Sequence, residues 1–278
     1  MVEEESTPDD LPAHAVAGSL ADTLQGARAW PERVTREWAV GGSTGAGVKV
    51  CVVDSGIEHG HPMVGEVSRS VTVTVTDDEQ VVVADDHDGD VCGHGSACAG
   101  IIRSIAPDCE LTSVRVLGEG FVGSGPVLVA GLRWAIEQGF QVINMSLSTT
   151  KRRFVSELHE LADLAYFRRS IIVASAHNMP VHSYPWRFSS VVSVASHDHD
   201  DPLVWYRNPT PPVEFYARGV DVDVAWMDGA SLRSTGNSFA TPHISGVCAL
   251  ILAKHPDLTP PEVKTVLGLI ADNAQDAA

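Results

Sequence analysis

The 278-residue sequence is short of positive charge. It contains 19 Lys and Arg residues against 36 Asp and Glu residues, so its formal net charge is −17. Nucleic acids and anionic membranes are bound through basic patches, and this balance therefore argues against both as partners. A strongly acidic chain suits solubility in a crowded or salty cytoplasm, and it is compatible with a cationic peptide substrate.

The sequence also lacks the patterns of membrane spans, secretion signals and cysteine-based metal sites. No apolar run approaches the roughly 18 residues that a transmembrane helix needs. The N-terminal segment MVEEESTPDDLP is acidic and has no apolar core of a signal peptide, which predicts a cytoplasmic protein. The five cysteines show no CxxC spacing and cannot all pair within one chain, so a reducing compartment is expected.

Short apolar runs alternate with helical stretches over most of the chain. The runs are rich in β-branched residues, as expected for strands buried on both faces of a parallel sheet. Strands are predicted over residues 48–53, 111–116, 141–145, 171–174 and 191–194, and helices over 126–138, 156–169, 238–254 and from Thr259 onward. This alternation predicts an α/β fold with a mostly parallel, doubly wound sheet flanked by helices. We expect one domain over residues 41–278, preceded by an extension over 1–40 that combines an acidic tail with a helical wrap.

Three short segments contain the residue types of a nucleophilic catalytic site. In VVDSGIEHGHP, an expected strand ends on Asp54, where open α/β sheets place their sites. In CGHGSACAG, His94 lies between glycines at the start of a helix, and in STGNSFATPHISG, Ser238 opens a long helix. Taken singly, these residues could be a turn residue, a packing histidine and a helix cap. Their coincidence predicts a catalytic triad.

The order Asp, His, Ser and the flanking residues closely resemble the subtilisin family of serine peptidases. The resemblance covers residues from about 38 to about 270. It implies that Ser238 is a nucleophile, that His94 takes its proton and that Asp54 orients the imidazole. In IIVASAHNMP, a strand is expected to end at Asn178, where the family has its oxyanion asparagine. The backbone N–H of Ser238 is expected to be the second oxyanion donor.

The same resemblance implies a cleft that holds an extended peptide or protein substrate. Its walls are expected to be Ser146, Leu147 and Ser148 on one side and Ser175, Ala176 and His177 on the other, with Val122 and Gly123 at a second edge. The family commonly has glycine at the positions of Ser148 and His177. A hydroxymethyl group and an imidazole there should narrow or polarise the cleft, unless His177 points away from it. We therefore expect restricted cleavage, such as processing of a precursor or leader peptide.

The tract ADDHDGD leaves three interpretations open. Asp85, Asp86, Asp88 and Asp90 could form a solvated acidic loop, bind calcium, or attract a basic substrate residue. No cofactor is expected to be required, and no metal is expected at the triad. Cys98 follows His94 by four residues and is expected on a similar helix face.

Two other functions are compatible with such a fold. One is a catalytically silent module that binds peptides or proteins, which would have no need of an intact triad and oxyanion donor. The other is a peptide ligase or macrocyclase, in which an amine replaces water as the acyl acceptor. Ligation requires the exclusion of water, and the sequence has no large insertion that could form a lid.

Overall fold

The computed structural model describes residues 30–76 and 78–274. The chain divides into two compact units, Met1–Val34 and Thr35–Ala278, and the elements described below lie in the second. This unit begins ahead of the predicted boundary at residue 41, because it includes the short helix α2 (Arg36–Val40). The Lys254 ammonium donates hydrogen bonds to the carbonyls of Glu37 and Gly41 at the two ends of α2. Residues 1–29 of the predicted N-terminal extension lie outside the described residues.

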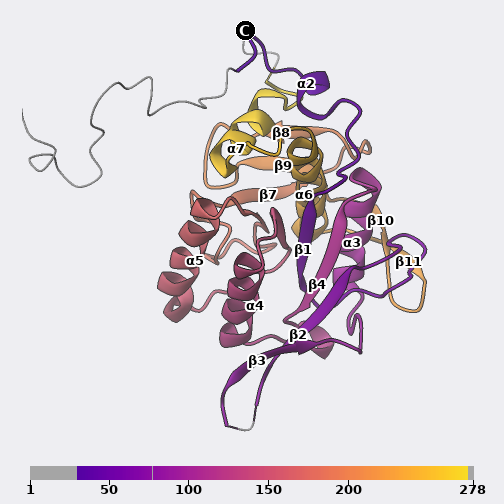
Figure 1. The fold of residues 1–278 in the computed structure, drawn as a ribbon, viewed down its shortest axis with the longest axis vertical. Coiled ribbons are helices and arrows are strands. Elements are labelled where there is room, and N and C mark those ends of the chain that lie inside the picture. Colours follow the sequence, from indigo (N-terminus) through magenta and orange to yellow (C-terminus); the bar gives the residue numbers. More distant parts are fainter. Residues whose placement is uncertain (1–29, 77, 275–278) are drawn as a thin grey trace, which may run out of the picture. The chain divides into compact units, whose positions relative to one another are not determined.

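Among the described residues, a nine-stranded sheet forms the centre of the second unit (Figure 1). Its strands run in the order β3 (Val81–Asp85), β2 (Arg69–Val75), β4 (Glu110–Arg115), β1 (Lys49–Asp54), β5 (Val142–Met145), β6 (Ile171–Ser175), β7 (Val192–His197), β9 (Phe215–Arg218) and β8 (Trp205–Arg207). In this part of the chain, only β3 and β8 are antiparallel to their neighbours. The predicted α/β fold with a mostly parallel sheet is confirmed.

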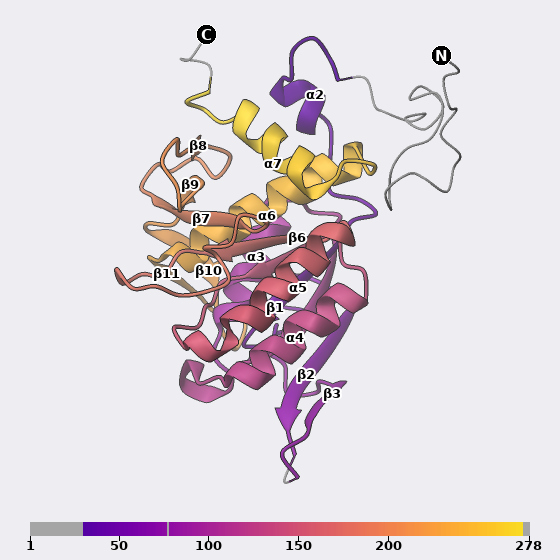
Figure 2. The ribbon, with the colours of Figure 1, turned by 90° about the vertical axis from the view of Figure 1, so that its left-hand side faces the viewer.

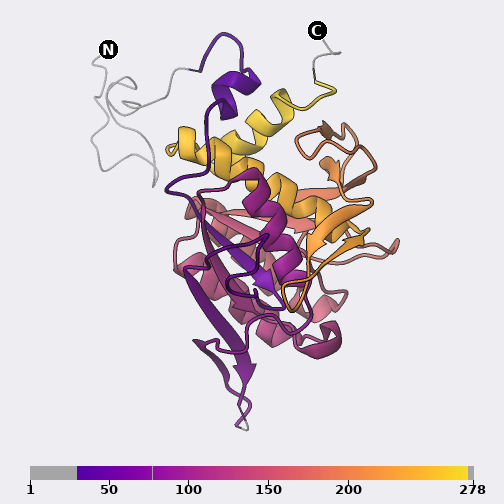
Figure 3. The same cartoon turned by 90° about the vertical axis from the view of Figure 1, so that its right-hand side faces the viewer.

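Helices cover both faces of the sheet. Helices α4 (Gly125–Glu137) and α5 (Val155–Phe167) lie side by side on one face (Figure 2). Helices α3 (His94–Ile105) and α6 (Asn237–Lys254) pack together on the other face (Figure 3). Helix α7 (Pro260–Leu269) follows α6 and begins with a capping box between Thr259 and Glu262. Short 3₁₀ turns, η2 (Glu119–Phe121) and η3 (Arg152–Phe154), precede α4 and α5.

The observed elements match the predicted ones best where the sequence is continuously apolar. Five of the six residues of β1 are buried, as expected for a strand covered on both faces. The prediction missed β2, β3, β8, β9 and the separate hairpin of β10 (Val222–Ala225) and β11 (Ser231–Ser234). These strands lie toward the ends of the sheet or outside it and are short or partly exposed, so their sequences lack long apolar runs.

The topology brings the ends of three neighbouring strands together. Strands β1, β5 and β6 run parallel in the middle of the sheet, so the segments that follow them emerge at the same edge. The first residues of α3 and α6, the two helices that pack together on one face of the sheet, add side chains to this edge. A Cβ atom at Gly246 would lie 2.6 Å from the Cβ of Ile105, and this glycine therefore lets the two helices approach closely.

The core under α4 should be sensitive to truncation. Leu132 is fully buried between α4 and the sheet. We expect Leu132→Ala to lower the free energy of unfolding by about 2–5 kcal/mol, because lost burial and a cavity add together. Chemical denaturation monitored by circular dichroism measures this change, in a Ser238→Ala background that prevents self-digestion.

Phe167 at the end of α5 is the matched control, since it is 79% exposed. Phe167→Ala should change the free energy of unfolding by no more than about 0.5 kcal/mol. Equal effects of the two substitutions would contradict this assignment of the core.

Candidate active site

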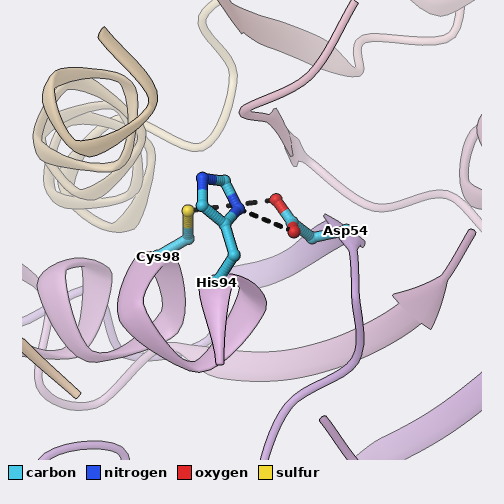
Figure 4. A group of neighbouring side chains, drawn as sticks. All are labelled: Asp54, His94 and Cys98. Carbon is cyan, nitrogen blue, oxygen red and sulfur yellow. Dashed lines mark hydrogen bonds and ion pairs between the residues drawn. The ribbon is translucent and has the colours of Figure 1, made fainter. Parts of the chain in front are cut away.

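A buried carboxylate and an imidazole form the centre of the candidate site (Figure 4). Asp54 is the last residue of β1 and is fully buried, and His94 is the first residue of α3. The Nδ1 atom of His94 lies 2.8 Å from Oδ1 of Asp54, which also accepts the N–H of Ser55 at 2.8 Å. When Nδ1 carries the proton, it donates a hydrogen bond to the carboxylate of Asp54. Nε2 is then unprotonated and is the acceptor of the ring.

Two glycines allow His94 to take this position. Gly93 caps α3 in the left-handed region, with φ of +84°, which disfavours other residues. A Cβ atom on Gly95 would lie 1.9 Å from the carbonyl oxygen of Gly56, just after β1. Gly95 therefore lets the start of α3 approach the end of β1, and Gly93 allows the turn that precedes it.

Asp90 organises the turn before α3. Its Oδ1 accepts the Ser55 hydroxyl at 2.8 Å and the N–H groups of Cys92 and Gly93 at 3.0 and 2.8 Å. Its Oδ2 accepts the N–H of Ser96 at 2.7 Å. Sequence analysis placed Asp90 in an acidic tract and missed this role, because the donors are backbone groups of a turn that only the folded chain forms.

Two opposing effects determine the pKa of His94. Burial lowers it, while the charge of Asp54, the hydrogen bond to Asp54 and the charge of Asp90 raise it. The raising effects prevail, and the pKa lies above its ordinary value of 6.5. The rings of Phe121 and Phe239 flank the imidazole, with centroids 5.8 and 5.6 Å from its own.

Ser238 lies in the first turn of α6. A chain of hydrogen bonds between polar groups connects this turn to the sheet. The Ser238 carbonyl accepts the Ser146 hydroxyl at 2.8 Å, and Ser146 accepts the Asn144 amide at 3.1 Å. The Ser245 hydroxyl in turn donates to Asn144 at 2.9 Å. Ser238 and His94 line the same cleft, and their side chains form no direct hydrogen bond with each other.

Asn178 is held beside Ser238 by the start of α6. Its Oδ1 accepts the N–H of Asn237 at 3.0 Å, which orients the amide. A Cβ atom built on Gly236 would lie 3.3 Å from Oγ of Ser238 and 3.6 Å from Nδ2 of Asn178, so both atoms border one small space. Strand β6 ends at Ser175, three residues before the predicted end at Asn178, and Asn178 lies in the loop that follows.

These groups border a cleft of about 350 Å³. Its lining includes seven of the eight residues predicted to contact substrate: Gly123, Ser146, Leu147, Ser148, Ser175, Ala176 and His177. Val122 is not among the residues that line the cleft, and its contact with substrate stays a prediction. It pairs with Gly118 in an isolated bridge, and its side chain is 72% exposed.

Sequence analysis missed much of the opposite wall. The lining also includes Val116, Leu117, Phe121, Gly125, Leu128, Thr149 and Lys151. These residues come from the segments after β4 and β5 and from the start of α4. In this region of the sequence, the one local signal was Ser124, a helix-capping residue that is followed by Pro126 at the start of the helix.

Ser148 and His177, where glycine was expected from the resemblance, are both among the residues that line the cleft. The hydroxyl of Ser148 donates to that of Ser183 at 2.9 Å, and Ser183 also accepts the Trp186 indole N–H at 2.8 Å. His177 lines the cleft, and its Nδ1 accepts the N–H of Met179 at 3.0 Å. The side chains of Ser148 and His177 are thus fixed at the cleft.

Asp54, His94 and Cys98 offer ligand atoms within 4.8 Å of one another (Figure 4). The Cys98 thiol lies 4.0 Å from Oδ2 of Asp54 and 3.7 Å from the carbonyl oxygen of Ser238. Burial, followed by the Asp54 charge, raises the thiol pKa well above its ordinary value. A metal here would have to displace the Asp54–His94 hydrogen bond and a firmly held thiol proton. The cluster suits proton transfer better than metal binding.

The acidic tract makes internal ion pairs. Asp86 accepts both the Nε–H and an Nη2–H of Arg115, at 2.8 and 2.7 Å, and Asp88 accepts from Nη2 at 2.8 Å. Asp85 lies 3.7 Å from Arg69 across the β2–β3 pair. Together with Asp90, these carboxylates are engaged by protein groups, and calcium binding stays one of the interpretations of this tract.

The fold and the juxtaposed aspartate, histidine and serine define a serine hydrolase on a parallel α/β sheet, in the chain order Asp, His, Ser. The chain belongs to the subtilase family, whose model matches residues 45–278. It is a subtilisin-like serine endopeptidase. In the described part of the chain, no helix is both long and apolar enough to cross a membrane.

Named relatives agree with this assignment. Subtilisin DY from Bacillus licheniformis is 29% identical over 85% of this chain and 88% of its own length. Subtilisin Savinase from Lederbergia lenta is 29% identical, over 81% and 84%. The match to minor extracellular protease Epr from Bacillus subtilis (strain 168) is 29% identical over 90% of this chain but only 39% of that protein. The crystal structure of a cold-adapted subtilisin-like serine proteinase superposes with a TM-score of 0.68 at 27% identity, over 83% of this chain and 86% of the other.

The raised pKa of His94 should depend on Asp54. Its folded value lies above 6.5, so protonation of His94 stabilises the fold below pH 6.5, and this contribution is lost as pH rises through the folded value. Asp54→Asn removes the charge and leaves the burial, so the pKa of His94 should fall. NMR titration of the imidazole measures it, in a Ser238→Ala background.

Asp223→Asn is the matched control for this titration. Asp223 is an exposed carboxylate on β10 that pairs with Arg233, and its replacement should leave the titration of His94 unchanged. A pKa of His94 that is the same in wild-type and Asp54→Asn proteins would refute the electrostatic assignment.

Proposed function

We propose that this peptidase uses Ser238 as nucleophile, His94 as general base and acid, Asp54 as the orienting carboxylate and Asn178 as an oxyanion donor. The observation that supports these roles is the 2.8 Å contact between His94 Nδ1 and the buried Asp54. It leaves Nε2 as the acceptor at a cleft that Ser238 also lines. Without such a base, a serine hydroxyl is a weak nucleophile.

The reaction proceeds in two halves. Ser238 Oγ attacks the carbonyl carbon as its proton moves to Nε2 of His94, and a tetrahedral intermediate forms. The carbon–nitrogen bond then breaks, and His94 returns the proton to the departing amine. Water attacks the resulting ester with His94 again as base, the acid product leaves, and Ser238 regains its proton. Asp54 keeps the imidazole oriented and stabilises its charged form throughout.

Two donors meet the negative oxygen of the intermediate. Nδ2 of Asn178 remains available because Oδ1 is the atom bonded to Asn237. The N–H of Ser238 is among the first N–H groups of α6, which have no partner within the helix. The partial positive charge of the helix N-terminus adds to this stabilisation. Removal of one such donor costs about 3 kcal/mol of transition-state stabilisation.

Fluorophosphonate labelling followed by peptide mass mapping tests these roles. The label should attach to Ser238, and His94→Ala should abolish it because the hydroxyl is no longer activated. Asn178→Ala should lower kcat by about 100- to 1,000-fold with a smaller change in KM. Ser156→Ala, an exposed serine on α5, should keep full labelling. A folded wild-type protein without label at Ser238 would refute the proposal and favour a silent peptide-binding module.

We further propose that cleavage is restricted, as in the processing of a precursor or leader peptide. The hydrogen-bonded pair of Ser148 and Ser183 and the imidazole of His177 support this, because they occupy space at the cleft. General protein digestion is the rival, and several relatives are named alkaline proteases, such as the one from Alkalihalobacillus alcalophilus.

The double substitution Ser148→Gly/His177→Gly tests the restriction. It should broaden the set of peptides cut from a proteome-derived library and raise kcat/KM most for large aromatic residues, because both side chains leave the cleft. Mass spectrometry of the products gives the cleavage profile. Efficient cleavage after large aromatic residues by the wild-type protein would contradict restricted cleavage.

A cytoplasmic location is also proposed. All five cysteines are buried and unpaired, as expected in a reducing compartment. Calcium binding at the tract 85–90 and its attraction for a basic substrate residue remain proposals with less support, since Asp86 and Asp88 already pair with Arg115.

A further inference from the structure

The cleft carries a positive charge that the catalytic mechanism does not use. Among its lining residues, the ionisable groups are Lys151, His94 and His177, and none of the lining residues is a carboxylic acid. The Lys151 side chain is exposed and makes no ion pair or hydrogen bond with any described residue. In a chain of net charge −17, the substrate cleft thus has an unneutralised cation.

Lys151 begins the run Lys151-Arg152-Arg153, the only three consecutive basic residues in the sequence. Arg152 and Arg153 are exposed and form no ion pair with described carboxylates. The Arg153 guanidinium lies over the Phe154 ring, 4.7 Å from its centroid. Because potentials from neighbouring like charges add, the two arginines reinforce the positive charge of the segment that carries Lys151.

The turn that carries Lys151 is anchored on both sides. On one side, Thr149 pairs with Tyr184 in an antiparallel bridge, and the Lys151 N–H donates to the Thr149 hydroxyl at 3.2 Å. On the other side, buried Phe154 packs so closely on Gly125 that a Cβ there would lie 1.9 Å from its ring. The backbone of Lys151 is thus held at the cleft, and its ammonium can meet a substrate group there without reorganisation of the loop.

We propose that the cleft selects peptides with an aspartate or glutamate at the substrate position that reaches Lys151, an inference that rests on the proposed function. The ammonium would pair with the substrate carboxylate, while the two arginines steer acidic segments to the entrance. A basic substrate residue attracted by the tract 85–90 would contact a different surface, because no residue of that tract lines this cleft. Lys151 is here a specificity-determining residue, separate from the catalytic groups.

A positional-scanning peptide library provides the test. Matched peptides carry Glu or its neutral analogue Gln at each position in turn, and the ratio of their kcat/KM values is measured. One position should favour Glu by about two- to fivefold, the range of an exposed ion pair. Lys151→Gln should bring this ratio to about one, and Lys151→Glu should invert it in favour of Gln. The preference should shrink in 1 M NaCl, because salt screens exposed charges.

Arg168→Gln is the matched control, because it also removes one exposed positive charge and Arg168 does not line the cleft. It should leave the Glu-to-Gln ratio unchanged. A wild-type ratio of one at every position, or a preference that survives Lys151→Gln, would overturn the proposal.

A second measurement separates this proposal from the proposed catalysis. If no peptide is cut and Ser238 takes no fluorophosphonate, the catalytic roles fail, and binding of the same peptides is measured by fluorescence anisotropy. Tighter binding of the Glu peptide by Ser238→Ala than by Ser238→Ala/Lys151→Gln would still support Lys151 as the acidic-residue contact. Equal binding by the two variants would overturn it.

Discussion

Burial of the Asp54 carboxylate constrains the whole site. A charged group removed from water is strongly destabilising unless it is paired and hydrogen-bonded. Asp54 is fully buried at the end of β1, and its Oδ1 is satisfied by the N–H of Ser55 and by His94. The start of α3 must therefore lie against the end of β1, which requires the close approach that Gly95 permits. The structural solution to a buried charge also produces an oriented imidazole.

The position of Ser238 depends on that of Asp54 and His94, because the helices that carry Ser238 and His94 pack against each other. Helix α6 packs on α3, and the Ser238 carbonyl receives the Ser146 hydroxyl from the end of β5. Asn144 and Ser245 complete this buried chain of hydrogen bonds, which is costly to break because each lost partner leaves another polar group unsatisfied. The nucleophile is thus positioned by the sheet as well as by its own helix, which gives the precision that acyl transfer requires.

The sequence was most informative where local pattern and function coincide. Strands such as β1 and the helix that begins near Ser238 followed from apolar runs and flanking turns, and Asp54 and His94 were found from their motifs. Contacts between distant segments could not be predicted. Asp90 lay in a tract that was open to three interpretations, although it binds the turn before α3, and no pattern in the sequence indicated that the turn of Lys151 folds against the cleft.

The most direct test of the central claim, that Asp54, His94, Ser238 and Asn178 act as one acyl-transfer site, is a crystal structure with a peptide boronic acid. Boron bound to a serine imitates the tetrahedral intermediate. We expect a covalent bond from boron to Ser238 Oγ, with one boronate oxygen about 2.7–3.1 Å from Nδ2 of Asn178 and from the backbone nitrogen of Ser238. A boronic acid that is unbound, or attached elsewhere while the cleft is accessible, would contradict this claim.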